Sequence, residues 1–507
     1  MKEVRRRAMF VLGWLSLLLA ACGDSGSAVP PVTSPAATSP AVTTAATSAS
    51  ATLSSPSATT TIAATTGPVS TSTAPATSAA VTTAPAGTIA STGTNADWPT
   101  YHRDNARTGY VSGVNDPRSL SKKWSVDLDG AVYAEPLVVG SHLLVATEGN
   151  SLYSLNTTSG QIEWHTNIAS PVPRSALPCG NIDPLGITGT PVYDPASGLV
   201  FAIAEISGPA HQLVGVDIQN GQVRLRRSAD PPGMDPRPHQ QRAALALSQG
   251  MVYIAYGGFF GDCGNYHGMV VASRTDGQGD LLSYQVPTAR EGGIWAPPGP
   301  AIDSQGRVFV SVGNGSETNG AWDHSDSVLR LSPDLKLEDG FAPQNWAAEN
   351  ARDADLGSLA PVLLPNGLVF IAGKGSTAYS LKADKLGGVG GQLEAKSLCS
   401  AYGGAASVGN RIFVPCTSGL LDVTVAGDGK MTTGWQANSQ IDGSPIVAGQ
   451  TVYTVDRNGT LYALNSENGQ PRASLVIGPT SRFATPTVSG GLVFVGTMKG
   501  VVAASIQ

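Results

Sequence analysis

The chain has 507 residues, a formal net charge of −6 and only 13% charged residues, against a globular average of roughly 25%. The shortage is local, because residues 25–96 contain no charged and no aromatic side chain, only Ala, Thr, Ser, Pro, Gly and a few other small or aliphatic residues. Such a stretch cannot bury enough apolar surface to offset its chain entropy, so it is not a domain. The acidic balance excludes a polybasic surface for nucleic acid, and we expect no nucleic-acid partner.

The first residues have the layout of an export signal. A basic segment, Lys2 to Arg7, precedes an apolar run over residues 8–21, which is shorter than the ~20 residues needed to span a bilayer. The run ends in Leu19-Ala20-Ala21-Cys22, which resembles a bacterial lipobox. The resemblance implies that residues 1–21 are a lipoprotein signal peptide and that Cys22 carries a lipid; a plain secretory signal with an incidental Cys22 is the alternative. We therefore expect an exported, extracytoplasmic protein, lipid-anchored to the cell membrane, with residues 22–96 as a disordered tether.

One phrase recurs through residues 97–507: a small residue or Pro, a few residues, a turn, and then a short apolar run such as Val308-Phe309-Val310. Eight copies begin at Pro136, Pro191, Ala244, Pro300, Pro361, Ala405, Pro445 and Pro486. Repeats of ~40–60 residues with short strands and Gly-containing turns favour propeller blades. Helical repeats would instead place apolar residues three and four positions apart.

The two ends of this region complete each other. The last copy offers three strands before the chain stops at Gln507, and one orphan strand, residues 123–128, precedes the first copy. If the orphan strand completes the last blade, no sheet edge is left open. We therefore predict that residues 97–507 form an all-β, eight-bladed β-propeller, closed by an N-terminal strand and monomeric.

The longest insertions fall in two classes of loop, from the fourth strand of one blade to the first of the next, and from the second strand to the third. These loops share one face of a propeller, which we call the top face, and they contain all four cysteines after Cys22. An oxidising compartment favours disulfides, and no two of these cysteines have the Cys-x-x-Cys spacing of zinc sites. Cys179 and Cys263 lie in loops of adjacent blades, and Cys399 and Cys416 flank the first two strands of one blade. We therefore expect the disulfides Cys179–Cys263 and Cys399–Cys416.

The phrase Leu152-Tyr-Ser-Leu-Asn-Thr-Thr-Ser-Gly-Gln-Ile-Glu-Trp164 is similar to the repeat of pyrroloquinoline-quinone (PQQ) dehydrogenases and their non-enzymatic relatives. In that family, Gly makes the turn and Trp docks onto the neighbouring blade. The middle of the chain resembles the quinoprotein alcohol dehydrogenase core through Gly293-Ile-Trp295, Gly313-Asn314 and Asp326-Ser-Val. This resemblance implies that Trp295 lies under the quinone and that Asn314 ligates Ca²⁺.

Two further segments carry the same resemblance. Asp353-Ala-Asp355 matches an aspartate-rich segment of the family, which implies that Asp353 or Asp355 is the catalytic base that takes the alcohol proton. Lys374 falls where the family has a basic residue near the quinone. The chemistry requires an aromatic plane and cationic groups for the anionic quinone, together with Ca²⁺ bound by about six to eight oxygen ligands.

The sequence also departs from the family. It has no adjacent Cys-Cys pair, the first aspartate of the catalytic segment is replaced by Asn350, an amide that cannot act as a base, and Glu205 is the best match to a calcium-ligating glutamate. Each matched residue has an ordinary structural alternative as well. Trp295 would pack between blades, Asn314 would cap a turn, Asp353 and Asp355 would lie in a solvated loop, and Lys374 would be a surface cation.

Two functions of different classes therefore follow. The first is a lipid-anchored binding or scaffold protein of the cell surface, whose top face holds a protein, glycan or small-molecule partner. It resembles the propeller lipoprotein of the outer-membrane assembly machinery in fold and anchoring. The second is a quinoprotein dehydrogenase that oxidises an alcohol or polyol with PQQ and Ca²⁺ as cofactors. The missing Cys-Cys pair and Asn350 favour the binding protein.

Overall fold

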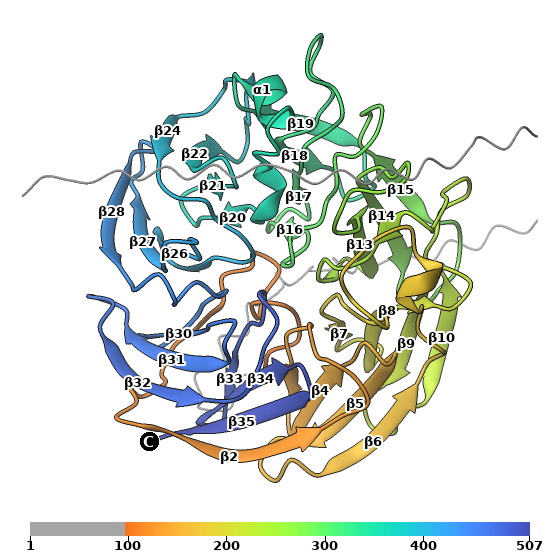
Figure 1. Ribbon diagram of the computed structural model, residues 1–507, viewed down its shortest axis with the longest axis vertical. Helices are drawn as coiled ribbons and strands as arrows, with labels where there is room; N and C mark the ends of the chain where they lie inside the picture. Colours follow the sequence, from red (N-terminus) through yellow and green to blue (C-terminus); the bar gives the residue numbers. More distant parts are fainter. Residues whose placement is uncertain (1–96) are drawn as a thin grey trace, which may run out of the picture. The chain divides into compact units, whose positions relative to one another are not determined.

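The computed structural model describes residues 97–507, so the expected signal peptide, the lipidation site Cys22 and the tether over residues 22–96 lie outside the described residues. The described residues form eight sheets around a common axis (Figure 1), and the predicted eight-bladed β-propeller is confirmed. Blades are numbered here in chain order of their innermost strands. Within residues 97–507, no helix is long and apolar enough to cross a membrane.

Each blade has four antiparallel strands in a simple meander from the axis outward. The strands of blades 1 to 4 are β3 (Leu137–Val139), β4 (His142–Ala146), β5 (Ser151–Asn156) and β6 (Ile162–Asn167); β7 (Val192–Asp194), β8 (Leu199–Ile206), β9 (Ala210–Asp217) and β10 (Val223–Ser228); β12 (Ala246–Ser248), β13 (Met251–Gly258), β14 (Met269–Arg274) and β15 (Leu282–Gln285); β16 (Ala301–Ile302), β17 (Val308–Val312), β18 (Ser327–Leu331) and β19 (Leu337–Ala342). Two short strands extend these sheets, β11 (His239–Gln240) on β13 and β23 (Gly388–Val389) on β19.

The strands of blades 5 to 8 are β20 (Val362–Leu363), β21 (Leu368–Ala372), β22 (Thr377–Lys382) and β24 (Glu394–Ser397); β25 (Ala406–Val408), β26 (Arg411–Val414), β27 (Leu421–Val425) and β28 (Met431–Gln436); β29 (Ile446–Ala448), β30 (Thr451–Val455), β31 (Thr460–Asn465) and β32 (Pro471–Val476); β33 (Thr487–Ser489), β34 (Leu492–Thr497), β35 (Gly500–Ile506) and β2 (Leu120–Asp127). Strand β1 (Tyr110–Val111) runs parallel to β29. The helical segments are α1 (Trp346–Asn350), η1 (Arg174–Ala176) and η2 (Leu356–Ser358).

Blade 8 is built from both ends of the described chain. Strand β2 lies beside β35 (Figure 1) and pairs with it antiparallel, with Trp124 opposite Ala503 and Val126 opposite Val501. The predicted closure is confirmed, although β2 begins three residues earlier than the expected strand over residues 123–128. This pairing leaves no blade with a missing outer strand.

Tryptophans of outer strands join neighbouring blades. Trp124 of β2 lies over the β5–β6 turn, where its Nε1 donates to the carbonyl of Thr157 at 3.2 Å. A Cβ at Gly160 in that turn would lie 2.7 Å from the Trp124 ring, and the turn has φ +73°, so only glycine fits. Trp164 repeats the joint on blade 2, with Nε1 donating to Ile218 O at 2.8 Å. The docking role that the family resemblance implied for this tryptophan is therefore seen.

Residues 97–111, which we call the bottom segment, lie inside the ring against the innermost strands, and begin at Asp97 beside the β3–β4 turn, at the end of the blade away from the top loops. Carbonyls of this segment accept hydrogen bonds from backbone N–H groups of four blades, at Tyr193, Ile302, Ser407 and Val447. Trp98, Tyr101 and Arg107 in it are at most 2% exposed. The segment therefore fills the inside of the ring below the top-face loops.

Candidate functional site

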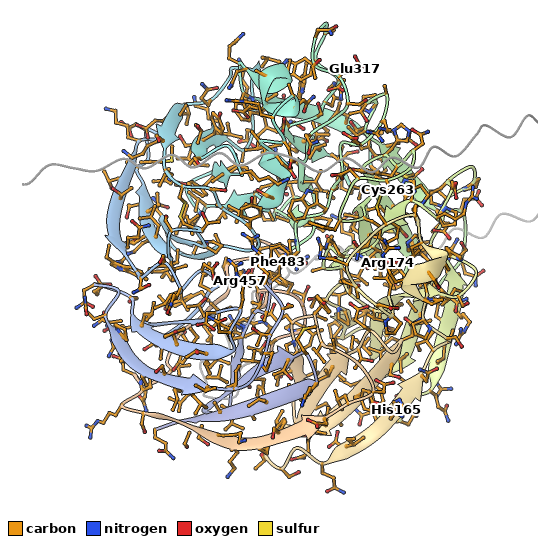
Figure 2. All side chains as sticks on the ribbon, in the orientation of Figure 1. His165, Arg174, Cys263, Glu317, Arg457 and Phe483 are labelled. Carbon is orange, nitrogen blue, oxygen red and sulfur yellow. A yellow bond between two sulfur atoms is a disulfide. The ribbon has the colours of Figure 1, made fainter. Side chains whose placement is uncertain are left out.

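A cavity of about 690 Å³ lies on the top face, lined by loops from most of the blades. Phe483, one of its lining residues, lies near the centre of the ring in Figure 2. The five residues matched to the quinoprotein core all line this cavity: Trp295, Asn314, Asp353, Asp355 and Lys374. The structure thus brings together in one place residues that span 80 positions of the chain.

Asp355 is the most enclosed ionisable group of the cavity. It precedes η2 in the loop between β19 and β20 and is 2% exposed. Its Oδ2 accepts a hydrogen bond from Trp295 Nε1 at 2.8 Å and lies 3.2 Å from Lys374 Nζ. Its Oδ1 is buried and has no hydrogen-bond partner within residues 97–507. Burial raises the pKa of Asp355, against the opposing effect of Lys374.

Lys374 joins the two aspartates. It lies between β21 and β22, and its backbone N–H donates to Asp355 O at 3.0 Å, which fixes the turn beside the aspartate loop. Its Nζ also lies 2.6 Å from Asp353 Oδ1. Burial by itself lowers the pKa of Lys374, but Asp355 and Asp353 together raise it above its usual value. One ammonium therefore pairs with both of the carboxylates expected to contain the base.

The Trp295 ring is already in contact with protein groups. Lys374 Nζ and Arg242 Cζ each lie 5.8 Å from its ring centroid, within the range of cation–π attraction. Phe483 meets the indole edge-on, with ring centroids 6.4 Å apart. Trp295 is therefore part of an aromatic and cationic wall of the cavity and does not offer a bare platform.

The two asparagines take different places. Asn314 lines the cavity, and its carbonyl accepts from Gly292 N at 2.8 Å. Asn350 is buried outside the cavity lining, with Oδ1 accepting from Gly315 N at 2.9 Å and Nδ2 donating to Ser325 Oγ at 2.8 Å. Asn350 therefore holds the loop between β17 and β18 in place and does not line the cavity.

Calcium does not fit the residues present. Glu205, the expected glutamate ligand, does not line the cavity, and its Oε1 accepts from Gln241 N at 2.8 Å. Its Oε2 faces His211 Nε2 at 3.7 Å, and burial raises the pKa of Glu205 to about 8. Asp355, the buried carboxylate of the cavity, is paired with Lys374. In residues 97–507 no three His, Cys, Asp or Glu side chains are arranged to hold a metal ion.

Sequence reasoning missed part of the cavity wall. Arg242 and Tyr402 lie at or near the ends of loops expected on the top face, but no motif singled them out. Arg482 and Phe483 come from the loop between β32 and β33, which is too short to stand out as an insertion. The repeat register alone could have placed this loop on the top face, because it joins a fourth strand to a first strand.

The two disulfides have the expected pairing, Cys179–Cys263 and Cys399–Cys416. The first ties the loop between β6 and β7 to the loop between β13 and β14. Both loops reach the cavity, through Asn181 and through Phe260 to Asp262. This cross-link therefore fixes one side of the cavity mouth.

Comparison with protein families identifies the repeat. The model of a PQQ-repeat family, described as outer membrane protein assembly factor BamB, matches residues 114–258 and 395–506, which is just over half of the chain. A curated relative, the polyvinylalcohol dehydrogenase of a Pseudomonas species, is 24% identical over 243 residues, which cover 44% of this chain and 35% of that protein. The chain therefore spans about a third of the length of that relative.

Solved structures share the fold. The quinohemoprotein alcohol dehydrogenase of Comamonas testosteroni aligns with a TM-score of 0.60 at 15% identity, over 80% of each chain. BamB from Moraxella catarrhalis aligns with a TM-score of 0.53 at 14% identity, over 76% of this chain and all of that one. At these identities the likeness shows the fold alone. By the family match, the chain belongs to the BamB-like PQQ-repeat family.

Proposed function

From membership of this family, we propose that the protein is a binding protein of the cell surface, whose top-face cavity holds a small organic ligand and performs no redox chemistry. The observation that carries the proposal is the Lys374 ion pair, at 2.6 Å from Asp353 and 3.2 Å from Asp355. A general base needs a carboxylate that is free to accept the substrate proton. Here an ammonium from the protein itself holds both candidates.

The cavity has the properties of a ligand site. Its volume of about 690 Å³ falls within the ~300–1,000 Å³ of small-molecule sites, which combine apolar walls with a few placed polar groups. Phe259, Tyr402 and Phe483 supply aromatic wall, and Phe260 at the mouth is 70% exposed. A recessed site of this volume supports a small-molecule ligand over a protein or glycan partner that would lie across a flat face.

The proposal includes attachment of the protein to the membrane through a lipid on Cys22. The Lys2–Arg7 segment, the apolar run and the lipobox-like Cys22 support an exported lipoprotein whose residues 22–96 tether the propeller to the membrane. Two disulfides in the propeller agree with an oxidising compartment, since disulfides persist there. Labelling with radioactive palmitate, lost in Cys22→Ser, would test the anchor.

A quinoprotein alcohol dehydrogenase is the second candidate. It is favoured by the meeting of Trp295, Asn314, Asp355 and Lys374 in one cavity, and by the similarity to a polyvinylalcohol dehydrogenase. Against it stand the lack of three clustered His, Cys, Asp or Glu side chains in residues 97–507 and the protein groups that already contact Trp295.

One experiment separates the two functions. Purified protein is incubated with PQQ and Ca²⁺, or with PQQ and a chelator, then desalted and assayed for dye reduction by alcohols and by polyvinyl alcohol. We expect no alcohol-dependent reduction in either case. Calcium-dependent turnover that is lost in Asp355→Asn would overturn the proposal. In parallel, thermal unfolding against a panel of small organic acids, sugars and amines should reveal ligands by a raised Tm.

A further inference from the structure

Two arginines of the cavity wall stand without a polar partner. Neither Arg242 nor Arg482 makes a side-chain hydrogen bond or an ion pair within residues 97–507, and both are only partly exposed. Each lies instead on aromatic rings. Arg242 Cζ is 5.4 Å from the centroid of Phe483, and Arg482 Cζ is 4.0 Å from the centroid of Tyr402 and 5.9 Å from that of Phe483.

The lack of a polar partner distinguishes Arg242 and Arg482 from the other partly buried arginines of the described chain. Every other described arginine that is not fully exposed has at least one hydrogen bond or ion pair; Arg411, for example, binds Asp422 with two N–H groups at 2.8 and 2.9 Å. Burial lowers the pKa of both Arg242 and Arg482, which reflects the cost of withdrawing a cation from water. An unpaired, partly buried guanidinium is expensive unless a partner arrives.

The carboxylates that influence the two arginines are engaged with other groups of the protein. Glu148 lies close enough to raise the pKa of Arg242, but its Oε1 accepts from the Thr188 hydroxyl at 2.8 Å and its Oε2 from Gly186 N at 2.6 Å. Asp355 is occupied by Lys374 and by the Trp295 indole. Asp442 lies close enough to raise the pKa of Arg482, but it pairs with Arg457 at 2.8 Å. Because none of these carboxylates pairs with Arg242 or Arg482 within residues 97–507, an anion from outside can take that place.

We propose that Arg242 and Arg482, with Phe483 between them, recognise a small organic dicarboxylate in the top-face cavity. A guanidinium that stacks on an aromatic face keeps its N–H edge free for bidentate binding of a carboxylate. Because both arginines lie near the same Phe483 ring, one small molecule can contact both, and its apolar body can pack against the ring. This inference rests on the proposed binding function and names the ligand class for that cavity.

The test uses two probes of the same shape, naphthalene-2,6-dicarboxylate and the uncharged naphthalene-2,6-dimethanol, titrated into the full protein by calorimetry. We expect the dicarboxylate to bind with an affinity that falls as salt is raised, and the diol to bind at least about tenfold more weakly. Arg242→Gln and Arg482→Gln should each weaken dicarboxylate binding by about tenfold or more. Arg482→Lys should recover only part of the loss.

The matched control is Arg237→Gln, which removes an arginine that is paired with Asp235, has a 71% exposed side chain and does not line the cavity; binding should be unchanged. Thermal unfolding of each variant shows whether it is folded. Equal affinity for diol and dicarboxylate would overturn the dicarboxylate assignment and leave the binding function standing. Absence of dicarboxylate binding, or binding unchanged in both Gln variants, would also overturn it. Failure of the binding function is detected separately, by alcohol-dependent dye reduction.

Discussion

The two ends of the propeller axis use the same residue type in opposite ways. At the bottom, Arg107 is 2% exposed, and its guanidinium donates to Leu245 O at 3.0 Å and to Pro300 O at 3.2 Å, which belong to different blades. At the top, Arg242 has aromatic neighbours and no polar partner in the described chain. Burial lowers the pKa of both, that of Arg107 to about 10.

The difference teaches how to separate structural polar groups from functional ones. Arg107 also donates to Thr100 Oγ1 at 2.8 Å and to Tyr101 O at 3.1 Å, so its hydrogen-bonding capacity is used by the fold. Buried polar groups in native proteins are normally satisfied in this manner. An unsatisfied cation in an open cavity is a departure from that rule, and departures of this kind are concentrated at sites that bind something else.

The largest expected effect is at the bottom. Arg107→Met removes the side-chain donor to Pro300 O of blade 4 and one of the two side-chain donors to Leu245 O of blade 3, which keeps only Thr100 Oγ1 at 3.4 Å. We expect a loss of about 3 kcal/mol or more in the free energy of unfolding, measured by urea denaturation. The exposed Arg237→Met serves as the control and should change stability by less than about 0.5 kcal/mol. Equal losses in the two variants would show that the bottom segment does not depend on Arg107.

The next effect is at the top. Lys374→Met leaves Asp355, which is 2% exposed, without its cation. We expect a loss of about 2 kcal/mol at neutral pH, below the ~3–5 kcal/mol of fully buried pairs because Lys374 is 21% exposed. Acid should relieve the loss, since a protonated Asp355 needs no counter-charge. Lys374→Arg should retain most of the stability. A loss that is independent of pH would assign Lys374 a packing role only.

Much of the fold could be predicted from the sequence because each blade repeats a local pattern. The eight starts, the closure by β2 and both disulfides follow from strand runs, turn glycines and loop classes that are visible in the chain. The early start of β2 was missed because Ser121 and Lys122 are polar. They are strand residues only through their pairing with β35, and such pairing leaves no trace in local composition.

The cavity could be predicted only in part, and for a physical reason. Trp295, Asn314 and Lys374 stand in family-like motifs, so their convergence could be expected from the resemblance. Arg242 and Arg482 belong to no motif. They stand out only because their guanidinium groups line the cavity without a hydrogen-bond or ion-pair partner in the described chain. Whether a side chain is paired depends on every neighbour in three dimensions, so no local pattern of the sequence contains that information.

A further prediction tests the bottom segment through the pH dependence of its stability. Glu135 accepts from Trp98 Nε1 and His102 N, both at 2.8 Å, yet burial raises its pKa from 4.5 to about 8. Between these values the unfolded chain loses the proton and the folded protein keeps it, so stability falls as pH rises from about 4.5 to about 8. Glu135→Gln should remove up to about 1.4 kcal/mol per pH unit of this slope. The free energy of unfolding is measured with urea at several pH values. If it changes equally with pH in the unmodified protein and in Glu135→Gln, Glu135 does not cause the slope.

The smallest expected effect bears most directly on the comparison. Arg242→Met replaces an unpaired guanidinium with an apolar chain between the rings of Trp295 and Phe483. We expect the free energy of unfolding to change by less than about 1 kcal/mol, and to increase if it changes, because no hydrogen bond or ion pair is lost and removal of a partly buried charge offsets the lost cation–π contacts. The same substitution at Arg107 should cost several times more. If Arg242→Met is as destabilising as Arg107→Met, then Arg242 has a structural partner in the protein, and the proposal that it binds an external anion is wrong.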